Sequence, residues 1–289
     1  MAPQNVQASV QFLKWQDLYS TEKPFNIFLD IPAEVKEQRK TNIVFEDIEI
    51  PIEDIRGKEH SFTLDNQGFM VSNLPPFTGA LDKATVQGVH LPAVENLLKE
   101  KVEGAERVFI FDWRVRRGDD EAHKEVIDLR DYSAPLKPTN AAHIDTSAIS
   151  AIKRLKLQLG EEASEAFKSR IRIVNVWQPV NHVVEDWPLA LCDGSTVDAS
   201  SLVETDIVRA GNLSSNLYMM HRNSNRWHYL PQQKLDEVWI FKQFDTKPDV
   251  KAHYCPHTSF KSPIAKLGTK SRQSIEVRTI VLTDPLASV

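Results

Sequence analysis

Ser274–Thr283, near the end of the 289-residue chain, reads SIEVRTIVLT. The polar residues Ser274, Glu276 and Arg278 alternate in it with aliphatic side chains and a threonine. Successive side chains of a strand point to opposite faces, so this period of two predicts a β-strand with one polar and one apolar face. Strand signals also dominate the middle of the chain, and the fold class follows from them.

The other strand signals are short runs rich in β-branched and aromatic residues. They cover Arg107–Arg114, Ile171–Trp177, Asp206–Ala210, Asn216–His221 and Glu237–Phe244. Such runs are typical of strands because branched and aromatic side chains pack well on a pleated, half-buried surface.

Helix signals are fewer. Pro92–Val102 has a proline near its first turn and apolar residues at helical spacing. Thr146–Leu159 begins with a threonine and a serine that can cap it, and Gly160 stops it. A second short helix is predicted over Glu161–Arg170. The apolar stripe of the longer helix consists of Ile149, Ile152, Leu155 and Leu159.

Many short strands with one helical insertion predict a mainly β fold, closed or double-sheeted, such as a jelly roll. An α/β fold with a parallel sheet would require strands and helices to alternate regularly, and they do not. We expect one domain over residues 1–289, with an N-terminal extension or lid (1–105) and a jelly-roll core (106–289) flanked by helices. The polar stretch Pro179–Thr205 is predicted to be a long loop, which in a compact domain is usually functional.

The composition, 41% hydrophobic and 26% charged, is that of a soluble globular protein. The formal net charge of -5 gives no basic surplus, so nucleic acid is not expected as a partner. No run approaches the roughly 18 apolar residues of a membrane helix, and no targeting signal is found. Two cysteines, Cys192 and Cys255, cannot build a disulfide framework, so a cytoplasmic setting is the default expectation.

His143-Ile144-Asp145 is the sharpest short feature and lies just before the helix predicted from about Ser147. Residues two apart on extended chain point to the same side, so this imidazole and carboxylate could hold one divalent metal. Two neutral nitrogen ligands and one carboxylate on one face typify non-haem Fe(II) sites, which leave coordination positions open. A second histidine is then needed from later in the chain.

His257 is the favoured second histidine because Arg272 follows it by fifteen residues, at the start of the last predicted strand. An arginine there could form two parallel hydrogen bonds with a carboxylate, and the Ser274 hydroxyl could add a third. The competing histidines are His253 and, more weakly, His221 and His228.

A simpler interpretation stays open for each residue. His143 could be a loop histidine with Asp145 capping the helix that follows. Arg272 and Arg278 could be solvated strand residues paired with Glu276. A zinc site is not expected, because no Cys-x-x-Cys accompanies Cys255. We also find no glycine-rich phosphate loop, Gly-x-Ser-x-Gly elbow or His-Glu-x-x-His motif.

Several blocks that span most of the chain resemble the fungal hydroxylase/desaturase family named for the aspergillic-acid enzyme. Relatives of that family are called gibberellin desaturase-like and cephamycin methoxylase-like. The blocks are DIRGKEHSFTLDNQGF (Asp54–Phe69), HIDTS (His143–Ser147), RIVNVWQPV (Arg172–Val180), DWPLALCD (Asp186–Asp193), RWHYLPQQKLDEVWIFKQFD (Arg226–Asp245), PHTSF (Pro256–Phe260) and RQSIEVRTIVL (Arg272–Leu282).

The resemblance implies an oxygenase that uses Fe(II), 2-oxoglutarate and O2, mostly in secondary-metabolite biosynthesis. It implies a double-stranded β-helix core, which is a jelly-roll or cupin-like fold. It also implies that His143, Asp145 and His257 are the iron ligands. Arg272, with Ser274, becomes the clamp for the distal carboxylate of 2-oxoglutarate.

Gln178 is the one departure from the family pattern, which usually has an arginine in that place. We count Gln178 with the cofactor-binding residues, because a lost charge there would alter the chemistry or the substrate. It is also the only hint of an alternative function, in which the chain is a catalytically silent partner subunit of an active oxygenase. A cupin-type metal enzyme that does not use 2-oxoglutarate is a third hypothesis, and it predicts that Arg272 is dispensable.

The substrate is expected to be an apolar or aromatic small molecule, such as a terpenoid, polyketide or peptide-derived natural product. Trp113, Trp187 and Met219, together with the 179–205 loop, are predicted to contribute to its pocket. If the chain assembles, the expected partner is a second copy or a homologous chain.

Overall fold

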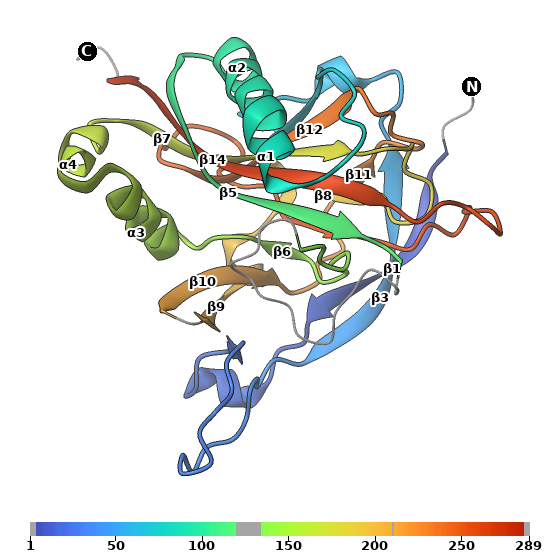
Figure 1. Ribbon diagram of the computed structural model, residues 1–289. Helices are drawn as coiled ribbons and strands as arrows, with labels where there is room; N and C mark the ends of the chain where they lie inside the picture. The colour runs from blue at the N-terminus through green and yellow to red at the C-terminus, as the bar shows by residue number, and fades with distance from the viewer. Residues whose placement is uncertain (1–3, 120–133, 210, 286–289) are drawn as a thin grey trace.

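The computed structural model describes residues 4–119, 134–209 and 211–285, and in them the strands form two sheets that face each other (Figure 1). The order in the larger sheet is β1 (Val6–Leu13), β3 (Phe45–Asp54), β11 (Trp227–Tyr229), β8 (Leu189–Cys192), β13 (His257–Ser259), β6 (His143–Ile144), β10 (Asn212–Met219), β9 (Leu202–Arg209) and β2 (Phe25–Ile27). The order in the smaller sheet is β4 (Phe69–Asn73), β12 (Glu237–Asp245), β7 (Ser169–Pro179), β14 (Gln273–Pro285) and β5 (Ala105–Arg117). This is the jelly-roll, double-stranded β-helix architecture that the sequence predicts.

β14 is the strand predicted from the alternating sequence, and it pairs antiparallel with β5 on one side and β7 on the other. Its apolar residues Ile275 and Val277 pack into a core on the outer face of the sheet. Its polar residues Glu276 and Arg278 point between the two sheets, where Glu276 is 3% exposed. The two-faced pattern is therefore confirmed, but its polar face lies inside the protein and not in solvent.

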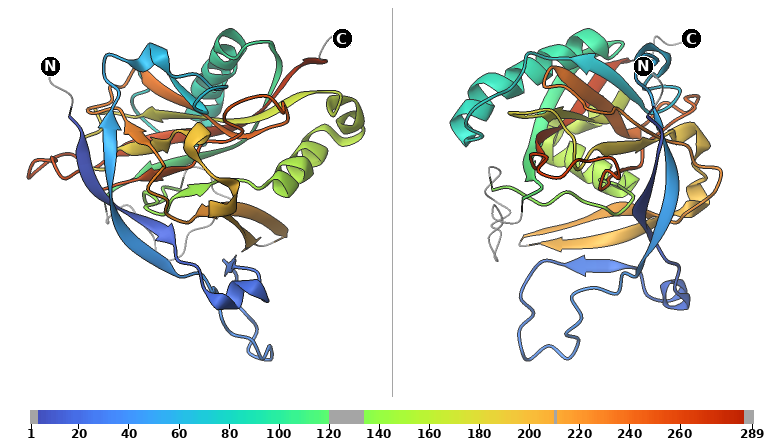
Figure 2. Two further views of the ribbon diagram at one scale, coloured as in Figure 1. Left: turned by 180° about the vertical axis from the view of Figure 1, so that it is seen from behind. Right: turned by 90° about the vertical axis from the view of Figure 1, so that its right-hand side faces the viewer.

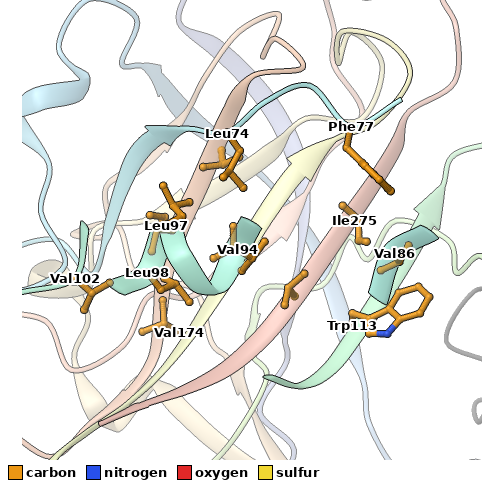
Figure 3. Close-up of a cluster of buried hydrophobic side chains, with 14 of the residues drawn as sticks. Leu74, Phe77, Val86, Val94, Leu97, Leu98, Val102, Trp113, Val174 and Ile275 are labelled. Atoms are coloured by element: carbon orange, nitrogen blue, oxygen red, sulfur yellow. The ribbon is translucent and has the colours of Figure 1, made fainter. Parts of the chain in front are cut away.

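A helical layer covers the outer face of the smaller sheet. It consists of α1 (Lys83–Thr85), one π-helical turn (Val86–His90) and α2 (Leu91–Lys101). Figure 3 shows Leu97 and Leu98 of α2 gathered over Val174 of β7. The helix predicted over Pro92–Val102 is confirmed, shifted by one residue.

α3 (Ala148–Leu159) is capped as predicted, because the Ser147 hydroxyl accepts a hydrogen bond from the Ser150 backbone N–H. Its predicted apolar stripe is wrong in part. Ile149 is 67% exposed and Ile152 39% exposed, while Leu155 is buried with Ala151 against the end of the smaller sheet. Ala151 and Leu155 lie four residues apart on the buried face of the helix, and Ile149 and Ile152 lie beside that face, towards solvent.

Two other predictions need correction. The helix expected over Glu161–Arg170 is only a short turn and α4 (Ala163–Ala166), because β7 begins at Ser169. The stretch Pro179–Thr205 is not one long loop, because it contains β8 in the middle of the larger sheet. All four residues of β8 are buried, so the strand lacks the alternation that reveals half-buried strands. Of the predicted strand Asp206–Ala210, residue 210 lies outside the described residues.

Strands that precede residue 106 extend both sheets. β1 pairs with β3 along its whole length, β3 also pairs in parallel with β11, and β4 pairs with β12. The segment between β1 and β3, which includes β2, projects from one end of the molecule (Figure 2).

His90, at the end of the π-helical turn, predicts a pH dependence of stability. It is buried and stacked on Phe77 with ring centroids 4.8 Å apart, and burial lowers its pKa from 6.5 to about 4. The unfolded chain therefore takes up a proton before the folded one does. The stability linked to the neutral His90 ring is complete above pH 6.5. From there down to about pH 4, the free energy of unfolding falls by about 1.4 kcal/mol per pH unit.

Urea unfolding at pH 7 and pH 5 measures this effect in wild type and in His90→Phe, which keeps a planar ring. We expect the variant to lose less stability than wild type between the two pH values. An identical loss in both proteins would contradict the assignment to His90.

Candidate metal centre

Strand pairing brings together the three predicted ligands, although 112 positions separate residues 145 and 257. β13 pairs antiparallel with β6, and His257 lies directly opposite His143, so both rings point to the same side, with centroids 4.3 Å apart. Asp145 follows two residues after His143. One ligand atom from each of the three residues lies within 4.8 Å of the other two. The cluster is therefore the right size to hold one metal ion.

Both histidines present Nε2 to the cluster, because Nδ1 is held by a backbone carbonyl. His143 Nδ1 lies 2.8 Å from the Ala141 oxygen, and His257 Nδ1 lies 3.4 Å from the Cys255 oxygen. A carbonyl only accepts, so Nδ1 carries the proton and Nε2 keeps its lone pair. Burial lowers the pKa of His257 to about 3, helped by the neighbouring His143. The ring is thus neutral near pH 7, which is the form that binds metals.

Three polar side chains orient Asp145. Arg278 donates to Oδ1 at 3.0 Å, Asn175 donates to Oδ2 at 2.6 Å, and the Gln243 side-chain oxygen accepts the Asp145 backbone N–H at 2.8 Å. Burial raises the pKa of the Asp145 carboxyl, but the Arg278 guanidinium outweighs that effect and holds the pKa well below its usual range. The carboxylate is therefore ionised and fixed before any metal binds.

Asn175→Ala should weaken metal binding without removing a ligand. Loss of its hydrogen bond frees Asp145 Oδ2, and groups that hold a metal ligand typically contribute 10–100-fold in affinity. Calorimetric titration with Mn(II) should show a drop of about that size. Asn73→Ala, on the exposed end of β4, is the control and should bind Mn(II) as wild type does. Equal affinities in both variants would show that Asn175 does not support the ligand.

Arg272 lies just before β14 and is fully buried. Its Nη1 donates to the Trp187 carbonyl at 2.8 Å and to the Ser259 hydroxyl at 2.7 Å. Its Nε and Nη2 are buried without a hydrogen-bond partner among the described residues, and so is the Ser274 hydroxyl. Burial lowers the pKa of Arg272 to about 9, helped by Arg116. These unpaired donors are the guanidinium of a buried cation and a neighbouring hydroxyl. A carboxylate could accept hydrogen bonds from them.

A narrow cavity lies beside the two histidine rings, and two of its wall residues contact Arg272. Its walls include the ligand rings of His143 and His257 and also Trp177 and Ser259, both of which contact Arg272. A small dicarboxylate could therefore reach the metal position with one end and Arg272 with the other. The remaining wall residues are Arg116, Thr139, Leu189, Thr258 and Glu276.

Several of these residues are not predicted by the sequence. Arg116 was missed because the predicted strand stopped at Arg114, whereas β5 runs on to Arg117. Glu276 and Arg278 belong to the predicted last strand, but the sequence leaves open whether their side chains are solvated. Their strict alternation with apolar residues indicates that both side chains share one face of the strand. That the second sheet covers this face is shown only by the tertiary structure. Asn175 carried no signal of its own.

The structure does not bring Gln178 to the cluster. Along β7, Trp177 and Asn175 face the ligands, whereas Gln178 points to the opposite, outer face of the sheet. There its amide N–H groups donate to the backbone carbonyls of Pro75 and Leu235. The alternation of side chains along a strand is the physical reason, and Gln178 has no contact with the candidate co-substrate cavity.

Two of the three predicted pocket residues, Trp113 and Met219, lie away from the cluster. Trp113 packs in the outer core with Val86 and Ile275, as Figure 3 shows. Met219 is fully buried in a cluster beside the larger sheet, next to β1 and β3. Trp187 is close to the site, but its backbone carbonyl makes the contact, by accepting from Arg272.

Known proteins resemble the chain in sequence and in fold. The hydroxylase/desaturase efuI of Hormonema carpetanum is 30% identical over 247 residues, which are 80% of this chain and 82% of that protein. Aspirochlorine biosynthesis protein N of Aspergillus oryzae is 36% identical, but over only 47% of this chain and 58% of its own length. The Fe(II)/2-oxoglutarate-dependent dioxygenase nvfI of Aspergillus novofumigatus is 29% identical over 84% of this chain and 86% of its own.

A solved structure of the iron and alpha-ketoglutarate-dependent endoperoxidase NvfI, a variant with one tryptophan replaced by phenylalanine, superimposes with a TM-score of 0.83. It covers 96% of this chain and 97% of its own, at 25% identity. The jelly-roll fold, the His-Asp-His cluster and the relatives together define the class of enzyme. The protein is a 2-oxoglutarate-dependent non-haem iron dioxygenase.

The chain belongs to a family of fungal hydroxylase/desaturases and Fe(II)/2-oxoglutarate-dependent dioxygenases. The family model that matches it is described as "Oxidoreductase/YMDC permease-like domain" and covers residues 10–282. Among the described residues, no helix is long and apolar enough to span a membrane.

Proposed function

We propose that the protein binds Fe(II) through His143, Asp145 and His257 and binds 2-oxoglutarate through Arg272 and Ser274. The observation that carries this proposal is the pair of unpaired N–H groups on the buried Arg272 side chain, which contacts Trp177 and Ser259 in the wall of the cavity beside the ligand rings. A buried donor without an acceptor is unfavourable by roughly 1–3 kcal/mol, so the site is built for an anion that fills it.

The iron and 2-oxoglutarate, when bound, supply the oxidation, in which O2 is consumed and 2-oxoglutarate is converted to succinate and CO2. The chain's own residues orient the metal-binding carboxylate and enclose the co-substrate. Arg278 and Asn175 keep the Asp145 carboxylate ionised and fixed, while Trp177 walls the co-substrate cavity. The acceptor is proposed to be a small natural product of fungal secondary metabolism that is hydroxylated, desaturated or oxidatively rearranged.

Two finer assignments belong to the same proposal. Within its family, the chain is placed with the aspergillic-acid-type enzymes on the blocks named above. Residues 1–289 are treated as a single oxygenase domain, and the pairing of β1, β3 and β4 with later strands supports this. The alternative of a silent partner subunit rests on Gln178, whose side chain lies away from the cluster, and the complete ligand set favours an active enzyme.

The test is the formation of succinate. Purified protein is given Fe(II), 2-oxoglutarate and O2, and succinate is followed by NMR with and without candidate substrates. We expect slow succinate formation without a substrate, acceleration by a substrate, and none when Fe(II) is omitted. Tight association with a homologous chain, and no succinate under any condition, would instead support the silent partner.

A further inference from the structure

A second cavity reaches Asp145 from the end of the molecule where α3, β9 and β10 lie. Among the described residues it shares no wall residue with the narrow cavity beside the two histidine rings, so the ligand cluster borders two separate spaces. Its charged wall residues are Arg154, Arg209, Arg278, Asp112 and Asp145. If the first cavity holds the co-substrate, the second is the space left for another molecule.

Both carboxylates of this cavity are already paired. Arg278 donates to Asp145 Oδ1 and to Asp112 Oδ2, each at 3.0 Å. Asp112 also pairs with Arg114, whose Nε lies 3.2 Å from Oδ1. The direct ion pairs of both acids are therefore with Arg278 and Arg114, and they act on Arg209 only at a distance.

Arg209 and Arg154 have no hydrogen bond or ion pair within the described ranges 4–119, 134–209 and 211–285. Arg209 Nε is buried without a partner, and the guanidinium carbon lies 5.3 Å from the centre of the Phe28 ring. The Arg154 guanidinium carbon lies 4.9 Å from the Phe111 ring. Burial lowers the pKa of Arg209, and the nearby Arg278 adds to that effect. Two cations without a directly bonded counter-ion in the described part of the chain therefore share one cavity.

The cavity also has an apolar wall, made by Phe111 and Ile173, and a free acceptor, because Asn175 Oδ1 is buried without a partner among the described residues. An apolar molecule with an acidic group would complement this arrangement. Its acidic group would pair with the arginines, and its body would lie on the apolar wall towards Asp145.

We propose that the substrate is an organic acid, bound in this second cavity with its carboxylate held by Arg209 and Arg154. The identification of that acid as the substrate rests on the proposed function, because the oxidation would occur at the cluster beside Asp145. The carboxylate narrows the expectation of an apolar or aromatic natural product to an acidic one.

The experiment uses protein loaded with Zn(II) and saturated with 2-oxoglutarate, so that no turnover occurs. Fluorine NMR titrations compare 4-fluorobenzoate with its neutral isostere 4-fluorobenzamide. We expect the benzoate to bind at least about tenfold more tightly, because a charge-assisted bond is worth about 1.5–3 kcal/mol. Arg209→Gln should weaken the benzoate about tenfold and leave the benzamide unchanged, and Arg154→Gln should act in the same direction.

Arg107→Gln is the matched control. Arg107 also lies on an aromatic ring, 4.9 Å from the centre of Phe109, but it pairs with the exposed Glu162 outside the cavity. This variant should bind both probes as wild type does. Thermal unfolding checks each variant, and if Arg209→Gln does not fold, Arg154→Gln carries the test.

The proposal would be overturned if wild type did not bind benzoate, if benzoate and benzamide bound with equal affinity, or if the folded cavity variants kept the benzoate affinity of wild type. A benzoate affinity that falls as 2-oxoglutarate rises would place the anion at Arg272 and would also overturn it. Failure of wild type to bind 2-oxoglutarate counts against the proposed function instead, so the two failures are distinguishable.

Discussion

His257→Ala is expected to lose Fe(II) binding and, with it, all measurable succinate formation. The substitution removes one of three ligand atoms from a cluster less than 5 Å across. Groups that only hold a ligand in place contribute 10–100-fold to metal affinity, so loss of the ligand itself should exceed about 100-fold. Anaerobic Fe(II) titration measures the binding, and NMR measures succinate.

His253→Ala is the control for this prediction. His253 is only partly buried, lies four residues earlier and was the main competitor for the ligand role. It should keep metal affinity and succinate formation. Normal Fe(II) affinity in a folded His257→Ala protein would show that the metal lies elsewhere and would remove the basis of the proposed function.

Arg272→Gln is expected to weaken 2-oxoglutarate binding by about 10²–10⁴-fold while the metal remains bound. The variant removes two charge-assisted hydrogen bonds, each worth about 1.5–3 kcal/mol. Arg272→Lys keeps the charge but cannot form two parallel bonds, so it should recover only part of the loss. Calorimetric titration of 2-oxoglutarate into Zn(II)-loaded protein gives the affinities.

Arg226→Gln is a suitable control, because Arg226 is exposed and pairs with Asp193 at 3.2 Å, outside both cavities. Its affinity for 2-oxoglutarate should equal that of wild type. If a folded Arg272→Gln protein retained full affinity and activity, the cupin-type hypothesis without 2-oxoglutarate would be preferred over the clamp.

Local patterns were enough to predict much of this protein. The alternation in residues 274–283 predicted β14, the His-x-Asp spacing put two of the proposed ligands on one side of the chain, and the Arg-x-Ser pair indicated the clamp that we propose. These features depend on the periods of strands and helices, which any short segment carries within itself.

Contacts between distant segments carry no such local signal. That His257 and not His253 faces His143 depends on the register of β13 against β6. Whether Arg278 points to water or to Asp145 depends on a second sheet that covers its face. Gln178 and Trp113 lie on the outer face because of where their strands fall in the sheet, and Arg209 lines a cavity only because residues of α3, β9 and β14 meet around it. Such pairings follow from the packing of the whole chain, since one residue of register shift turns every side chain of a strand to the other face.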